Sequence, residues 1–216
     1  MKYPIQPFQP IGPFAVAIKP IVYYGISPKA FSEGYGIMEL HKGTHGTCKS
    51  HAIVISEKGF EMFNTQPIRG NGVYFWRDNA YGVELAISWY TKQFKKGEYS
   101  RQRFQTCSVI KADIKAEEDQ TINLEDPAVK DLILKTIQDK GVRSKHGICA
   151  VFDKYIELVE RSIKKNIQLV LTQVQAPESD VYPKAYINTA YCYVVRQIDC
   201  IYITAIDHYD EGDIKC

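Results

Sequence analysis

The chain has 216 residues, of which 45% are hydrophobic and 24% charged, and its formal net charge is +2 from 27 basic and 25 acidic side chains. This length and composition are typical of one globular domain and exclude a disordered, collagen-like or coiled-coil chain. Because no block of one sign dominates, the charge balance predicts neither strong attraction to nucleic acid nor a membrane-surface role.

The six cysteines are spread along the chain, without a CxxC pair or histidines at zinc-finger spacing. We therefore expect no structural zinc site and no metal. Prolines interrupt the apolar run that a signal peptide would need, and no stretch reaches the roughly 20 apolar residues that span a bilayer. These features predict a soluble protein in a reducing compartment, with the cytoplasm as the expected location.

Residues 1–36 contain Pro4, Pro7, Pro10, Pro13 and Pro20 and are predicted to form an extended arm with a short strand over residues 20–27. Residues 37–216 are predicted to form the folded domain. Residues 36–46 have the composition of a strand, and a helix over residues 48–58 should end at Gly59. The glycine-rich stretch 68–76, IRGNGVYFW, should enter a short aromatic strand, followed by a helix over residues 78–92.

Further along, residues 104–114 have the β-branched composition of a strand. Residues 124–165 show the apolar repeat of helices, interrupted at Gly141. Residues 167–175, 185–198 and 200–206 return to strand patterns. Strands at both ends with helices between them predict the α+β class, with a largely antiparallel sheet and flanking helices.

Two segments carry the functional signal. His45-Gly46-Thr47 stands where the first strand passes into a helix, with fourteen positions from His45 to Gly59, and Gly70 to Phe75 read GNGVYF. Together they resemble the catalytic core of the poly(ADP-ribose) polymerase-like ADP-ribosyltransferases, in which an HGT or HGS strand end, a helix closing with GF or GL and a GxGxYF strand follow one another. The resemblance is concentrated between His45 and Tyr90 and implies an ADP-ribosyltransferase-like fold with a split β-sheet.

The resemblance implies that NAD is the substrate and that His45 and Tyr74 are catalytic. His45 would bond a hydroxyl of the nicotinamide-side ribose, and Tyr74 would stack on the nicotinamide ring, a contact that is worth about 1 kcal/mol beyond burial. Gly46 has no Cβ, so its backbone can approach the carboxamide closely. The resemblance also implies that Thr47, Gly72 and Tyr81 bind NAD. Thr47 would bond ribose or cap the helix.

The family's third catalytic element is a glutamate near the start of a late strand. Here Thr189, Tyr191 or Cys192 stands in its place. Relatives that replace this glutamate are commonly mono-ADP-ribosyltransferases or inactive. A carboxylate from elsewhere in the chain, Glu84 or Asp180, is the alternative source of negative charge.

Three simpler interpretations accompany these assignments. His41, in LHKGT, is a rival of His45, although the HGT spacing favours His45. Neighbouring residues of a strand face opposite ways, so Phe75 should lie in the core if Tyr74 lines the site. Cys192 is better explained as a small buried hydrophobic residue than as a nucleophile.

The resemblance therefore implies an NAD-dependent mono-ADP-ribosyltransferase that modifies a protein or nucleic acid and has no membrane partner. Its one-domain size resembles bacterial or phage effectors, toxins and defence proteins. One alternative is an NAD glycohydrolase, and another is an inactive module that binds NAD or ADP-ribose. An RNA 2′-phosphotransferase is less favoured because its further histidine and arginine motifs are not found.

Overall fold

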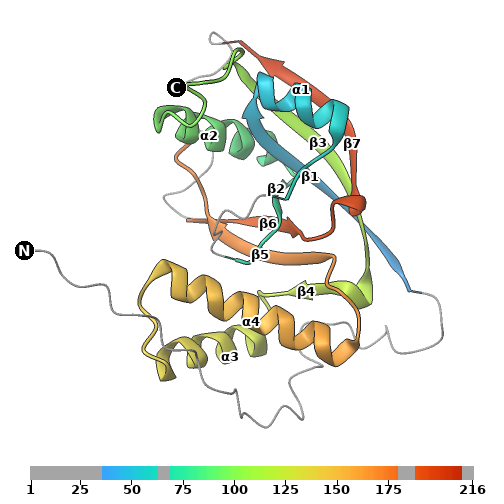
Figure 1. The fold of residues 1–216 in the computed structure, drawn as a ribbon, viewed down its shortest axis with the longest axis vertical. Coiled ribbons are helices and arrows are strands. Elements are labelled where there is room, and N and C mark those ends of the chain that lie inside the picture. Colours follow the sequence, from blue (N-terminus) through green and yellow to red (C-terminus); the bar gives the residue numbers. More distant parts are fainter. Residues whose placement is uncertain (1–35, 63–68, 180–187, 211–216) are drawn as a thin grey trace, which may run out of the picture.

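The computed structural model describes residues 36–62, 69–179 and 188–210. Their strands form one seven-stranded sheet in the order β4-β5-β6-β2-β1-β3-β7 (Figure 1). The strands are β1 Met38–Cys48, β2 Val73–Arg77, β3 Cys107–Glu117, β4 Thr121–Asn123, β5 Leu169–Gln175, β6 Thr189–Val195 and β7 Ile201–Tyr209. Only β4 and β5 pair in parallel, and the other neighbouring pairs are antiparallel. The predicted α+β class and the largely antiparallel sheet are confirmed.

Four α-helices pack on this sheet within the described residues: α1 Lys49–Lys58, α2 Gly82–Lys95, α3 Pro127–Asp139 and α4 Lys145–Ile163. Phe75 of β2 shares a buried cluster with Ala52 of α1, whereas its neighbour Trp76 shares one with Leu85 of α2. Because successive strand residues point to opposite faces, α1 and α2 cover opposite faces of the sheet. Helices α3 and α4 pack on the same face as α2, through a third cluster that includes Val194 of β6.

The sheet is strongly twisted. In Figure 1, β1, β3 and β7 run steeply through the upper part of the molecule, whereas β4, β5 and β6 run nearly horizontally above α3 and α4. The short strand β2 joins the two parts, because it pairs with β6 on one side and β1 on the other.

Local sequence signals account for most helix boundaries. Gly59 follows α1 with a φ of 79° and a ψ of −178°, a conformation essentially restricted to glycine, and its N–H donates to the Ile55 carbonyl at 2.8 Å. Asp126 caps α3 by accepting from the Ala128 N–H at 2.9 Å, and Ser144 caps α4 by accepting from the Gly147 N–H at 3.0 Å.

The predicted boundaries need corrections. Helix α2 begins at Gly82 and not at residue 78, because Asn79 forms a turn in which its side chain accepts from the Tyr81 N–H at 2.9 Å. Strand β4 and two 3₁₀ turns, Glu118–Gln120 and Ile198–Cys200, were not predicted from the sequence. The predicted arm and its strand over residues 20–27 lie outside the described residues except for Gly36.

Candidate functional site

The two motif segments meet where the sheet divides. Strands β1 and β2 pair only at Gly43 with Arg77 and at Thr44 with Trp76. Beyond that point β1 continues beside β3 as far as Cys48, while β2 stays paired with β6 back to Val73. The segment of β1 from His45 onward and the start of β2 therefore bound a gap in the sheet, which we call the β1–β2 gap.

His45 bridges this gap. Its Nδ1 lies 2.9 Å from the carbonyl oxygen of Tyr74, and since a carbonyl only accepts, Nδ1 carries the hydrogen. The imidazole also packs edge-on against Phe60, with ring centroids 5.3 Å apart, and contacts Phe75 at 5.7 Å. Burial lowers the pKa of His45, although the bond to Tyr74 opposes this effect. The ring is therefore neutral at pH 7, and no described residue bonds its Nε2.

The glycines of both motifs lie where backbones approach closely. A Cβ on Gly46 would lie 1.8 Å from the Ala86 carbonyl oxygen of α2. A Cβ on Gly72 would lie 2.6 Å from Val194 and 2.7 Å from the carbonyl oxygen of Val195 in β6. Packing of α2 and β6 thus explains both glycines without a ligand, and the close approach of a ligand to Gly46 stays a prediction.

Thr47 does not cap the helix, which corrects one of its two predicted roles. Strand β1 extends through Cys48, which takes the N-cap position of α1 without a capping side-chain bond. The buried Thr47 hydroxyl instead lies 3.5 Å from Nδ1 of His51. Tyr81 occupies the N-cap of α2, and its partly buried ring packs on the cluster that contains Trp76.

Tyr74 lies on the other face of the sheet from the His45 ring. Its side chain packs with the clusters on the α2 and α4 face, whereas Phe75 is fully buried on the α1 face, as expected from strand alternation. The Tyr74 hydroxyl donates to the Gly70 carbonyl at 2.9 Å and accepts from the Arg69 N–H at 3.2 Å. Burial raises its pKa well above the usual range of a tyrosine, so this phenol stays protonated.

The three candidates for the glutamate position lie on β6. The register pairs Tyr74 with Val194, so Thr189 lies about 17 Å away along the strand and Tyr191 about 10 Å. Cys192 is closer and shares the face of Tyr74, but it is 2% exposed, and burial raises the pKa of its thiol. The interpretation of Cys192 as a buried hydrophobic residue agrees with this position, and a buried thiol is a poor nucleophile.

Of the two alternative carboxylates, the structure describes Glu84. Glu84 accepts from the Ser179 hydroxyl at 2.8 Å at the start of α2, and Asp180 lies outside the described residues. Asp153 of α4 was not among the predicted site residues. It contributes to the raised pKa of Tyr74, and its Oδ1 is buried with no hydrogen-bond partner among the described residues. The apolar repeat of this helix does not indicate that Asp153 lies near Tyr74.

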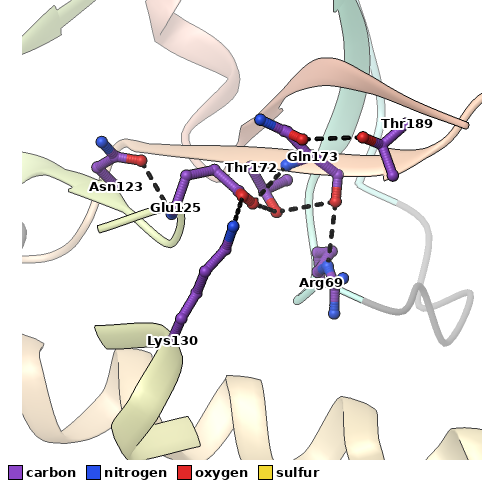
Figure 2. Close-up of polar contacts among 7 residues, drawn as sticks. All are labelled: Arg69, Asn123, Glu125, Lys130, Thr172, Gln173 and Thr189. Atoms are coloured by element: carbon purple, nitrogen blue, oxygen red, sulfur yellow. Dashed lines mark hydrogen bonds and ion pairs between the residues drawn. The ribbon is translucent and has the colours of Figure 1, made fainter. Parts of the chain in front are cut away.

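A polar network beside Tyr74 was also missed (Figure 2). Arg69 Nε donates to the Gln173 carbonyl at 3.4 Å, and the Gln173 N–H donates to Glu125 Oε1 at 2.7 Å. On the opposite side of the strand, the Thr189 hydroxyl donates to the Gln173 side chain at 2.9 Å. The one sequence signal for Arg69 was its position directly before the GNG stretch.

The rival histidine has a different environment. His41 Nε2 lies 3.2 Å from a carboxylate oxygen of Glu39, and its ring lies 5.2 Å from that of Tyr193. His41 precedes the β1–β2 gap, because its neighbours Gly43 and Thr44 are still paired with β2. His45 is therefore the histidine of β1 that touches both motif segments.

Comparisons of the chain with models of known protein families, with curated proteins and with solved structures give no match. In the described part of the chain, no helix combines the length and apolar character needed to cross a bilayer. The same residues contain no group of three His, Cys, Asp or Glu side chains that could hold a metal ion.

Proposed function

We propose that the chain is an NAD-dependent mono-ADP-ribosyltransferase with an ADP-ribosyltransferase-like fold, and that NAD binds in the β1–β2 gap. The observation that carries the proposal is the bond from His45 Nδ1 to the Tyr74 carbonyl, which joins motif segments 29 residues apart at the point where the sheet divides. A divided antiparallel sheet is also what the resemblance to this family implies.

The state of His45 fits a ribose contact. Since Nδ1 donates to Tyr74, the neutral ring offers Nε2 as an acceptor for a ribose hydroxyl. Breaking the bond between nicotinamide and ribose develops positive charge on the sugar, and a charged imidazolium beside it would oppose that change. The burial that lowers the pKa of His45 keeps the ring neutral and avoids this repulsion.

The proposed reaction substitutes at the ribose carbon that carries nicotinamide. The carbon–nitrogen bond breaks, its electron pair leaves with neutral nicotinamide, and an acceptor nucleophile bonds to the same carbon and loses its proton. In this scheme His45 and the Gly46 backbone hold the ribose and carboxamide, and Tyr74 supplies a ring for stacking. Orientation of this kind and hydrogen bonds aimed at the sugar are the contributions that such a site can make.

The positions of the two rings define how NAD must lie. His45 packs with Phe60 and Phe75 on the α1 face, and Tyr74 packs on the opposite face. For both to touch one NAD molecule, the nicotinamide-side ribose has to reach His45 across the β1–β2 gap while the nicotinamide ring lies on the face of Tyr74. Variants of both residues should therefore weaken NAD binding, whereas a ligand confined to one face would depend on one of them.

We test the proposal with labelled NAD and a pool of cellular protein and nucleic acid. The wild type should release nicotinamide and leave labelled ADP-ribose on one class of acceptor, whereas His45→Ala and Tyr74→Ala should reduce both signals. His41→Ala is the matched control, because it removes the neighbouring histidine of the same strand and should keep the activity. Unchanged NAD with an unlabelled pool would overturn the transferase proposal.

A second candidate function is an NAD-binding module without turnover. It is favoured by the positions of the glutamate replacements, since Thr189 and Tyr191 lie far along β6 from Tyr74 and Cys192 is buried. Calorimetry distinguishes the two functions: NAD binding with no nicotinamide released over a long incubation selects the module. Cytoplasmic location is part of the proposal, and the buried free thiols of Cys48, Cys107, Cys192 and Cys200 support it.

A further inference from the structure

Three contacts hold Arg69 beside Tyr74. Its N–H donates to the Tyr74 hydroxyl at 3.2 Å and its Nε to the Gln173 carbonyl at 3.4 Å, while the centre of its guanidinium lies 4.6 Å above the Phe152 ring. Figure 2 shows the guanidinium below Gln173, at the edge of the network around Glu125. These contacts involve the backbone N–H, Nε and one face of the guanidinium. No described residue bonds the two terminal nitrogens.

Glu125, the carboxylate that raises the pKa of Arg69, does not bond the two terminal nitrogens. Glu125 raises the pKa of Arg69, but burial of the guanidinium acts more strongly in the opposite direction. Glu125 itself is an acceptor for the Gln173 N–H at 2.7 Å and for the Thr172 hydroxyl at 3.3 Å, and it forms an ion pair with Lys130. Arg69 is thus a partly buried cation whose terminal donors are not bonded by any residue that the structure describes, and they can bind an anion.

The neighbouring Arg196 provides a contrast. Its Nη1 donates to the Asn71 carbonyl at 3.3 Å and lies 4.0 Å from Asp153, and its Nη2 lies 3.8 Å from Glu160. Both terminal nitrogens of Arg196 therefore have acidic or carbonyl partners within the chain. Within residues 36–62, 69–179 and 188–210, the terminal donors of Arg196 have partners and those of Arg69 have none.

We propose that Arg69 binds the diphosphate of NAD. This inference rests on the proposed function, in which the adjacent Tyr74 ring stacks on nicotinamide. A guanidinium presents two parallel N–H donors that match two phosphate oxygens, and partial burial strengthens such bonds. The Phe152 ring and the Gln173 carbonyl fix the plane of the guanidinium in advance, so little freedom is lost when an anion binds. A guanidinium placed in this way binds either a phosphate ester or a free phosphate. In NAD, the diphosphate is the group that it would bind.

The experiment is calorimetric titration of the full chain with four probes: NAD, ADP-ribose, inorganic pyrophosphate and nicotinamide. Arg69→Gln should lower the affinity for NAD and ADP-ribose by ten- to a hundredfold, roughly the value of a charge-assisted pair of bonds. Its affinity for nicotinamide, which lacks phosphate, should stay within a factor of about two. Arg69→Lys keeps the charge without the two parallel N–H donors, so its loss of affinity should be intermediate. Arg196→Gln is the matched control and should bind ADP-ribose like the wild type.

The outcomes separate this inference from the transferase proposal. Wild-type affinity of Arg69→Gln for ADP-ribose would overturn the role of Arg69, even if the chain turns over NAD. Binding of ADP-ribose that depends on Arg69, without nicotinamide release, would keep the inference and reject the transferase. Binding of pyrophosphate but not ADP-ribose would identify a free-phosphate site and overturn the assignment to NAD. If Arg69→Gln and Arg69→Lys lower the melting temperature but not the affinity, Arg69 has only a structural role.

Discussion

Replacing Gly46 with alanine should displace α2 from the sheet. The new Cβ would lie 1.8 Å from the Ala86 carbonyl oxygen, 2.5 Å from its carbonyl carbon and 3.1 Å from its Cα. Real Cβ atoms essentially never approach other atoms closer than 3.0 Å, so the backbone of β1 or α2 has to move. No rotation of a flexible side chain can relieve this contact, because every one of these atoms belongs to the helix backbone.

The expected cost follows from this geometry. Overpacking a core typically costs 1–3 kcal/mol, and we place Gly46→Ala at about 3 kcal/mol because a whole helix must shift. For a chain of this size that loss corresponds to a melting temperature lowered by roughly 6–12 °C. The shift would also move Gly82, at the start of α2, whose carbonyl accepts from the buried Thr44 hydroxyl at 2.7 Å.

Urea unfolding followed by circular dichroism measures this loss as a lower midpoint with an unchanged slope. Gly59→Ala is the control for backbone strain without overpacking: Gly59 has a φ of 79° and a ψ of −178° with open space around its Cβ position, so strain of about 1–3 kcal/mol is expected with α2 left in place. A Gly46→Ala variant as stable as the wild type would refute the packing assigned to α2.

Four further predictions concern the candidate site. Tyr74→Phe should lower the free energy of unfolding by about 1–2 kcal/mol, because it removes two hydrogen bonds of a buried hydroxyl. Its affinity for NAD should stay within about threefold of the wild type, because the ring remains. Thermal melts test the first expectation and NAD titration the second. Because burial lowers the pKa of His45 in the folded chain, the unfolded chain takes up the proton more readily, so the free energy of unfolding should fall as pH drops below the ordinary value of 6.5. Unfolding curves at several pH values should show a smaller fall for His45→Gln, and an equal fall in both chains would contradict this. Cys192→Ala should keep nicotinamide release at the wild-type rate, and a lost activity in a folded variant would restore the thiol as a nucleophile. Thr189→Glu should also leave that rate unchanged, because the register puts residue 189 about 17 Å along β6 from the partner of Tyr74; a large gain would show that the strand register differs.

Much of the fold follows from local signals. The strand before His45, the helix that ends at Gly59 and the strand through Tyr74 were predicted because each is marked by its own periodicity or glycine. Strand β4 was missed because its three residues, Thr121–Asn123, are too few for a pattern, and its partner β5 lies some 48 residues later. The early start predicted for α2 reflects Asn79, whose side chain forms a turn that apolar spacing does not reveal.

The site was less predictable, since it depends on contacts between distant segments. The sequence placed His45 and Tyr74 near each other, but their rings lie on opposite faces and touch only through a backbone carbonyl. Which face a side chain takes depends on the pairing of β1 and β2, which ends after two residue pairs. Asp153 comes near Tyr74 through the packing of α4 on the sheet, and Arg69 meets Gln173 through the placement of β5 two strands from β2. No local pattern encodes either contact.

The most direct measurement is a crystal structure of the chain with a hydrolysis-resistant NAD analogue. The proposal predicts an analogue that lies across the β1–β2 gap, with a ribose hydroxyl donating to His45 Nε2 and the nicotinamide ring against Tyr74. An analogue bound away from this gap, or one that leaves His45 Nε2 without a ribose contact, would contradict it.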